Sequence, residues 1–271
     1  MRLAFYIKKR SLAGDPRIDA LRSELEAGGC EVTVVKERKD LLPGFDALLS
    51  LGGDGTFLSA ASLVGDSGIP VLGVNLGRLG FLSEYKPDEV VGALLTGEFT
   101  VEDRSLLRME VAGTGHTDIS LNEVAVHRKG AAVLGVDVTV DGDSLPTCWA
   151  DGFLVATSSG STAYSLSVGG PICLPETKVF IVAPISPHNL NVRPLIVPET
   201  SHLRISLRSR DESAVLTMDN RNHTIPTGAR IEVCAAPVRL KRLRLGRSNF
   251  INALRSRLLW GEDVRNSSDS E

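Results

Sequence analysis

A Gly-Gly-Asp-Gly-Thr run at residues 52–56 places one carboxylate among three glycines. Residues 47–51 before it are typical of a buried strand, and residues 57–63 after it are typical of a helix. Glycines let phosphate oxygens approach backbone N–H groups, and the N-terminus of the following helix adds partial positive charge. A carboxylate opposes anion binding unless it accepts a proton or meets a metal ion. The run therefore predicts phosphate chemistry at Asp54, and the alternative is a glycine turn in which Asp54 or Thr56 caps the helix.

Residues 151–171 form a second glycine-rich stretch, which is also rich in hydroxyl groups. Residues 153–156 predict a strand that enters a loop, and a short helix is expected to begin near Ser161. Hydroxyl and amide groups of such a loop can bind ribose and phosphate oxygens, and Tyr164 offers a ring that can stack on a base. The alternative is a Ser/Thr-rich helix cap with Tyr164 in the core.

Two further motifs are weaker when each is taken alone. Asn122-Glu123 is a polar pair inside the strand-like run 119–127, and such a pair is more often a solvent-facing bulge or turn. Polar residues that face inward need partners. Residues 73–82 again place glycines just after a predicted strand, which is also compatible with an ordinary loop.

The bulk properties favour an enzyme that acts on small molecules. The net charge of −3 and a pI near 6.0 give no global field for nucleic acid or an anionic membrane. No apolar run reaches eighteen residues, and the N-terminus is typical of a strand followed by charge rather than of a signal peptide. The four cysteines lie far apart without a CxxC pair, and the histidines show no metal spacing. We therefore expect a cytoplasmic protein with no metal-ligand residues and reduced, mostly buried cysteines.

Residues 1–100 predict an α/β nucleotide-binding domain. Apolar strands alternate with helical segments, which is typical of a parallel, Rossmann-like sheet covered by helices. Asp15 is a predicted N-cap and Pro16 the first helical residue. Ligands of such sheets bind at the carboxyl ends of the strands, where residues 52–56 would lie.

Residues 101–245 predict an all-β, sandwich-like domain, because short strand-like runs alternate there with Gly, Asp, Asn and Pro. Its last segment, 239–245, alternates basic and apolar residues, which usually indicates a solvated strand face. Residues 246–271 predict a helix capped by Ser248, ended by Gly261 and packed back on the first domain, followed by a disordered tail at 266–271. The apolar stripe of this helix consists of Phe250, Ile251, Leu254, Leu258 and Leu259.

The four motifs together, in this order and spacing, resemble the NAD kinase family. Residues 184–194, with a Pro-His and an Arg-Pro pair, and the helix at 249–260 support the resemblance. The Gly-Gly-Asp-Gly-Thr run alone is shared with lipid kinases and phosphofructokinases, whereas its combination with Asn-Glu and Gly-Ser-Thr-Ala-Tyr is specific.

The resemblance implies transfer of the terminal phosphoryl group of ATP to the 2′-hydroxyl of the adenosine ribose of NAD, which yields NADP. Mg²⁺ or another divalent cation would accompany ATP, and the protein would form homodimers or homotetramers through its β-rich part. Asp54 would be the catalytic residue that accepts the hydroxyl proton. Residues implied to line the substrates are Gly52, Gly53, Asp54, Gly55, Thr56, Asn75, Arg78, Phe81, Asn122, Glu123, Asp151, Thr162, Ala163, Tyr164, Ser165, Leu166, Ser167 and Arg221.

Two positions depart from the family pattern. Trp149 stands where bacterial relatives commonly have a basic residue, and Asp219-Asn220-Arg221 replaces an Asp-Gly followed by Gln or Arg. Arg221 is a fallback ligand contact for this reason. Two alternatives to the kinase stay open: a lipid kinase, although no route to a membrane is visible, and a non-catalytic NAD-binding sensor. A dehydrogenase is disfavoured because no G-x-G-x-x-G follows the first strand.

Overall fold

The computed structural model describes residues 1–77, 79–246 and 249–259. The contacts within it divide the chain into two compact units. The first unit consists of residues 1–60, 69–102 and the chain from 242 onward, and the second consists of residues 61–68 and 103–241. The chain thus leaves the second unit after residue 241.

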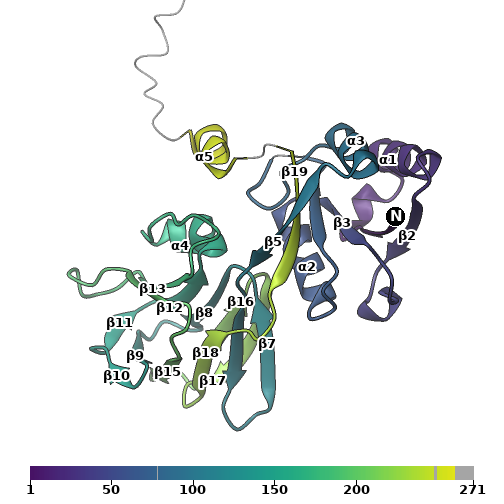
Figure 1. Ribbon diagram of the computed structural model, residues 1–271. Coiled ribbons are helices and arrows are strands. Elements are labelled where there is room, and N and C mark those ends of the chain that lie inside the picture. The colour runs from purple at the N-terminus through teal and green to yellow at the C-terminus, as the bar shows by residue number, and fades with distance from the viewer. Residues whose placement is uncertain (78, 247–248, 260–271) are drawn as a thin grey trace, which may run out of the picture. The chain divides into compact units, whose positions relative to one another are not determined.

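A six-stranded sheet in the order β2-β1-β3-β4-β19-β5 forms the centre of the first unit, and the pairs from β2 to β19 are parallel. In Figure 1 the yellow strand β19, late in the chain, runs among the blue strands of this sheet. The predicted α/β class with a parallel sheet is confirmed. The elements are β1 (Arg2–Tyr6), η1 (Arg10–Leu12), α1 (Pro16–Ala27), β2 (Glu31–Val35), η2 (Arg38–Asp40), β3 (Ala47–Gly52), α2 (Asp54–Val64), β4 (Val71–Asn75), α3 (Pro87–Thr96), β5 (Phe99–Arg104), β19 (Leu240–Leu245) and α5 (Phe250–Leu258).

Local sequence signals define α1 and the strands beside it. The Asp15 side chain accepts the N–H of Arg17 at 3.0 Å, Pro16 is the first helical residue, and Gly28 ends the helix, as predicted. Every residue of β3 and β4 is buried, which explains why both strands are mainly apolar.

The prediction of a solvated basic face on β19 is wrong for Arg242. This strand lies between β4 and β5, and the Arg242 side chain is only 5% exposed. Leu240 and Leu243 point to opposite faces of the strand and both are buried. Because both faces are covered, a basic residue between them needs a partner inside the protein.

Two antiparallel sheets form the second unit, in the orders β10-β9-β15-β18-β6-β7 (with β11 beside β9) and β14-β13-β12-β8-β16-β17. Their apolar side chains share one core, so the predicted sandwich is confirmed. The elements are β6 (Leu107–Val111), β7 (His116–Ser120), β8 (Glu123–Arg128), β9 (Leu134–Val140), β10 (Asp143–Ser144), β11 (Cys148–Ala150), β12 (Gly152–Thr157), η3 (Ser159–Thr162), α4 (Tyr164–Ser167), β13 (Val179–Ile185), β14 (Leu195–Pro198), β15 (Leu203–Arg208), β16 (Ser213–Met218), β17 (Arg221–Pro226) and β18 (Arg230–Ala235).

The single strand expected at 119–127 is in fact two strands in different sheets, β7 and β8. The chain changes sheet between them, where the Asp219 carboxylate accepts the N–H groups of Leu121 and Asn122 at 2.9 and 2.7 Å. These two N–H groups lie between the strands, so the Asp219 carboxylate supplies the acceptor that neither sheet provides.

The C-terminal helix α5 belongs to the first unit, as predicted. Its N-cap is Asn249, whose side chain accepts the N–H of Ile251 at 2.8 Å, rather than Ser248, which lies outside the described residues together with Gly261 and the predicted tail. Leu254 is buried, but Leu259 is 61% exposed, so only part of the predicted apolar stripe is covered.

Candidate functional site

Asp54 is the first residue of α2 and follows directly on β3. Its carboxylate accepts three consecutive backbone N–H groups: Oδ2 that of Phe81 at 2.8 Å, and Oδ1 those of Leu82 and Ser83 at 3.1 and 2.8 Å. An ionised carboxylate offers about four acceptor positions. Three are used, so one acceptor position of Asp54 is left for a ligand hydroxyl.

The glycines around Asp54 have different roles. Gly52 has a φ of +155°, and a Cβ there would lie 2.4 Å from Oγ1 of the buried Thr56, so the turn itself requires glycine. At Gly53 and Gly55 an added Cβ would meet no atom within 4 Å. The protein does not fill that space, and the absence of side chains leaves the backbone open to ligand oxygens.

The segment after β4 folds back over its own strand. Asn75 is buried, and its amide donates to the carbonyl of Ser83 at 3.1 Å and accepts the N–H of Gly77 at 2.7 Å. A Cβ on Gly80 would lie 2.0 Å from Oδ1 of Asp54. Of the predicted residues in this loop, Asn75 therefore shapes the loop, Phe81 holds Asp54 through its N–H group, and Arg78 lies outside the described residues.

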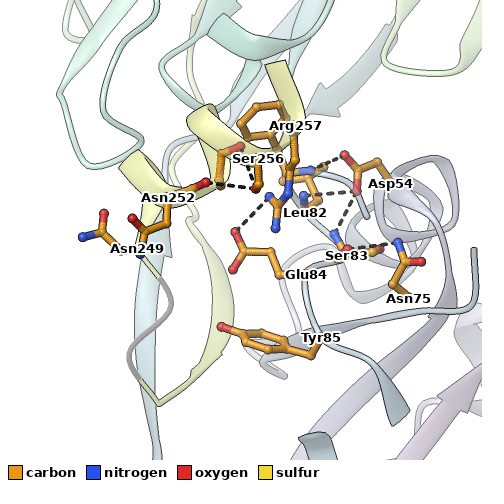
Figure 2. A network of polar contacts seen from close by, with 12 residues as sticks. Asp54, Asn75, Leu82, Ser83, Glu84, Tyr85, Asn249, Asn252, Ser256 and Arg257 are labelled. Carbon is orange, nitrogen blue, oxygen red and sulfur yellow. Dashed lines mark hydrogen bonds and ion pairs between the residues drawn. The ribbon is translucent and has the colours of Figure 1, made fainter. Parts of the chain in front are cut away.

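A buried ionic cluster follows directly on this loop, and sequence reasoning missed it. Glu84 Oε2 lies 3.1 Å from Nη2 of Arg242, and Glu84 Oε1 lies 3.5 Å from Nη1 of Arg257. Figure 2 shows Asp54 and Arg257 converging on the segment that carries Leu82, Ser83 and Glu84. The sequence does contain one signal for Arg242. The leucines on either side of it point to opposite faces of β19, which indicates a strand that is covered on both faces.

The second unit brings Asn122 and Glu123 close to the glycine-rich stretch. Thr157 donates its N–H to the carbonyl of Asn122 at 2.9 Å and its hydroxyl to that of Leu121 at 2.6 Å. A Cβ on Gly160 would lie 2.2 Å from the Asn122 oxygen, so only glycine permits this approach. Asn122 and Glu123 are buried rather than in a solvent-facing turn, which corrects the expectation for the isolated pair.

Glu123 is a buried acid next to another acid. Burial, and secondarily the charge of Asp219, raise the pKa of Glu123 to about 8, although the backbone N–H of Tyr164 donates to it. Its Oε2 has no hydrogen-bond partner among the described residues. Burial also raises the pKa of Asp219, against the effect of the amides that it accepts. At neutral pH Glu123 is therefore mainly protonated and presents a hydroxyl donor.

The expected helix near Ser161 is reduced to η3 and the four-residue α4. Tyr164 is half-buried and stacks on His127, with ring centroids 5.7 Å apart and an interplanar angle of 18°. Burial lowers the pKa of His127, so its ring is mainly neutral at pH 7. Ser165 faces inward with its hydroxyl unpartnered among the described residues. The other predicted residues of this stretch are half-buried or exposed: Thr162, Ala163, Leu166 and Ser167.

The remaining predicted positions already have protein partners. The Asp151 carboxylate accepts Nε of Arg128 at 2.6 Å, and both side chains are partly exposed. Arg221 pairs with Asp118 at 3.0 Å and also donates to a backbone carbonyl, so it links β17 to β7. Asp219, the first residue of the Asp219-Asn220-Arg221 departure, binds the backbone between β7 and β8, and its sequence signal was an Asp-Asn turn between strands.

No group of three metal-ligating side chains occurs among the described residues. Across the same residues no helix is long and apolar enough to cross a membrane.

Models of the ATP-NAD kinase N-terminal domain and the ATP-NAD kinase C-terminal domain match residues 21–97 and 121–245. Among curated relatives, an NAD kinase of Porphyromonas gingivalis is 43% identical over 231 residues, which are 83% of this chain and 80% of the relative. An NAD kinase of Flavobacterium psychrophilum is 36% identical over 236 residues, 84% of this chain and 80% of the relative.

Solved structures of similar fold cover nearly the whole chain. Yeast NADH kinase complexed with NADH superimposes with a TM-score of 0.86 at 25% identity, over 98% of this chain and 90% of that one. An NAD kinase from Archaeoglobus fulgidus in complex with ATP gives a TM-score of 0.78 at 26% identity, over 94% and 98%.

Proposed function

Because the chain belongs to the NAD kinase family, we propose that it transfers the terminal phosphoryl group of ATP to the 2′-hydroxyl of the adenosine ribose of NAD, giving NADP and ADP. It is an enzyme that phosphorylates NAD at the expense of ATP. Neither a lipid kinase nor a non-catalytic sensor finds support among its relatives.

The single observation that carries the proposal is the Asp54 carboxylate, fixed by three amides with one acceptor position left. In the proposed step the 2′-oxygen forms a bond to the γ-phosphorus as the bond to the bridging oxygen of ADP breaks. The hydroxyl proton passes to Asp54. The transition state of such transfers is loose, so the proton leaves late and a weak base suffices.

Open backbone at Gly53 and Gly55 supports a place for phosphate oxygens at the N-terminus of α2. We assign the remaining ligand contacts of the first unit to Gly52, Thr56, Asn75, Arg78 and Phe81. A divalent cation would arrive bound to the phosphates of ATP. That cation neutralises charge on the transferring group.

The second unit supplies the groups proposed to hold the dinucleotide. The protonated carboxyl of Glu123 can donate to a ribose or base acceptor, and Asn122 lies next to it. Tyr164 can stack on a ring with the face that His127 does not cover. Residues 162–167 line the same region, Asp151 is assigned to the nicotinamide side, and Arg221 is kept only as a fallback contact.

A homodimer or homotetramer and a cytoplasmic location complete the proposal. The edge strand β14 exposes Leu195 and Ile196, at 42% and 49%, and an apolar edge of this kind invites pairing with a second copy. All four cysteines are free, which suits a reducing compartment.

Incubation with ATP, Mg²⁺ and NAD, followed by measurement of NADP, tests the function, with Asp54→Asn as the decisive variant. We expect NAD binding to be nearly unchanged while kcat falls roughly 10²- to 10⁴-fold, the usual contribution of a general base. Asp19→Asn, an exposed aspartate on α1, is the matched control and should keep full activity. Absence of NADP from the wild-type reaction, or equal loss of binding and turnover in Asp54→Asn, would contradict the proposal.

A further inference from the structure

Two residues whose N–H groups hold Asp54 are themselves fixed through their carbonyl oxygens. Nη2 of Arg242 lies 3.3 Å from the carbonyl oxygen of Leu82, and Nδ2 of Asn75 lies 3.1 Å from that of Ser83. The N–H groups of both residues bind the Asp54 carboxylate. Any displacement of this segment therefore moves the carboxylate with it.

Glu84 is the point at which this segment meets two guanidinium groups. The side chains of Glu84, Arg242 and Arg257 are 8%, 5% and 13% exposed. A carboxylate so far from water needs compensating charge, and its position follows the charges around it. Arg242 comes from β19 of the sheet, whereas Arg257 comes from α5, near the end of the described chain.

Helix α5 also contacts the other end of the segment. The Arg257 guanidinium lies 5.3 Å from the centre of the Phe81 ring, within the range of a cation–π interaction. Phe250 of the same helix packs on that ring, with centroids 6.0 Å apart. Arg257 therefore touches the residues on both sides of Leu82 and Ser83, whose N–H groups bind Asp54.

We propose that Arg257 is a positioning residue for the phosphoryl-transfer step: it acts through Glu84 and Phe81 to hold the segment that orients the carboxylate of Asp54. This inference rests on the proposed role of Asp54 as the base. Under this proposal α5 contributes to turnover by orienting Asp54 and not by contacting a substrate.

The surroundings of Arg257 indicate that a truncated side chain would leave the fold intact, so a positioning role can be tested apart from a packing role. Its side chain borders a cavity of about 480 Å³, which Tyr85 and Asn252 also line. Its Nε has no hydrogen-bond partner in the described part of the chain, and its Nη1 makes the ion pair with Glu84 at 3.5 Å without a hydrogen bond. Truncation would therefore enlarge an existing space, and Glu84 would keep Arg242 as its partner. We expect the variant to fold.

The first test compares Arg257→Ala with Arg255→Ala, which removes an exposed arginine from the same helix. We expect kcat of Arg257→Ala to fall roughly 10- to 100-fold, the usual effect of a misplaced catalytic group, with KM for NAD and ATP changed less than about threefold. Arg257→Lys should recover part of this loss because it keeps the charge. The melting temperature should change little in all three variants.

The second test asks whether Arg257 acts through Glu84. If it does, Arg257→Ala should lower kcat much less in a Glu84→Gln background than in the wild type, because the two losses are not additive. Full additivity, or an Arg257→Ala variant with unchanged kcat, overturns the inference. A Glu84→Gln protein that fails to fold leaves the decision to the Ala and Lys variants of Arg257. Loss of kcat in Asp54→Asn with normal turnover in Arg257→Ala would refute only the positioning role. Full turnover in Asp54→Asn would refute the role of Asp54 as base, and absence of NADP from the wild-type reaction would refute the proposed function itself.

Discussion

A Cβ atom on Gly80 would lie 2.0 Å from Oδ1 of Asp54, so the carboxylate occupies the space that any larger residue at position 80 needs. The same carboxylate accepts N–H groups from the residues that follow Gly80. The loop and the carboxylate thus fix each other. Neither can move without breaking hydrogen bonds in a partly buried place.

Replacing Gly80 by alanine should therefore displace Asp54 without removing it. We expect Gly80→Ala to lower kcat by about 100-fold while the protein remains folded, because a misplaced base loses alignment with its acceptor. Measurement of NADP formation and of the melting temperature checks this. Gly77→Ala, in the same loop, is the control, since a Cβ there meets no atom within 4 Å and its N–H bond to Asn75 is retained. Equal activity of the two variants would contradict the prediction.

The secondary structure was predictable where local signals are strong. Asp15 and Pro16 define the start of α1, and the apolar runs at β3 and β4 reveal buried parallel strands. Strands β14 and β17 are among those that escaped prediction. The first ends in a proline, and the second alternates polar residues with only a single fully buried side chain, Ile225. Without knowledge of the neighbouring strand, neither sequence can be distinguished from that of a loop.

The candidate site was likewise predictable only where its signals are local. Sequence motifs identify residues such as Asp54 and Glu123, whose types and spacing are local. They do not identify Glu84 and Arg257, because the partner of each lies far along the chain and the contact exists only after α5 returns to its unit. Long-range charge pairing has no sequence period, so only a structure reveals it.

Asp219 should be a stabilising residue of the second unit. Its carboxylate accepts three consecutive N–H groups, and its backbone has a φ of +50°. We expect Asp219→Ala to lower the free energy of unfolding by about 2 kcal/mol more than Asp141→Ala, because it leaves buried donors unpaired. Asp141 is the comparison, since it has a φ of +52° and is exposed, and its carboxylate accepts the N–H of His202 at 2.8 Å at the surface. Denaturant unfolding measures the difference, and equal losses would show that the buried donors bound by Asp219 add nothing to its contribution.

The exposed edge strand β14 predicts an effect of Ile196→Asp on association. A charge on this apolar edge should oppose pairing between copies and shift the protein toward the monomer by at least tenfold in dissociation constant, equal to about 1.4 kcal/mol. Analytical ultracentrifugation over a concentration series measures the shift. Leu42→Asp places the same charge at an exposed apolar residue away from β14, with an exposed fraction of 59%, and should have no effect. If both variants behave like the wild type, β14 is not the interface.

Glu123 should make stability fall as the pH rises. Its pKa in the folded protein is about 8, above the ordinary value of 4.5, so between these two values the folded state keeps a proton that the unfolded chain has lost. Unfolding then releases a proton, and each pH unit in this window lowers the free energy of unfolding by up to about 1.4 kcal/mol. Glu123→Gln removes the titration, so its unfolding free energy should depend less steeply on pH between 5 and 8. His127 titrates in both proteins and cancels in the comparison, whereas Asp219 interacts with Glu123, so the difference in slope reports the two neighbouring acids together. Chemical denaturation at several pH values provides the measurement, and identical slopes for the two proteins would mean that Glu123 is ionised in the folded state.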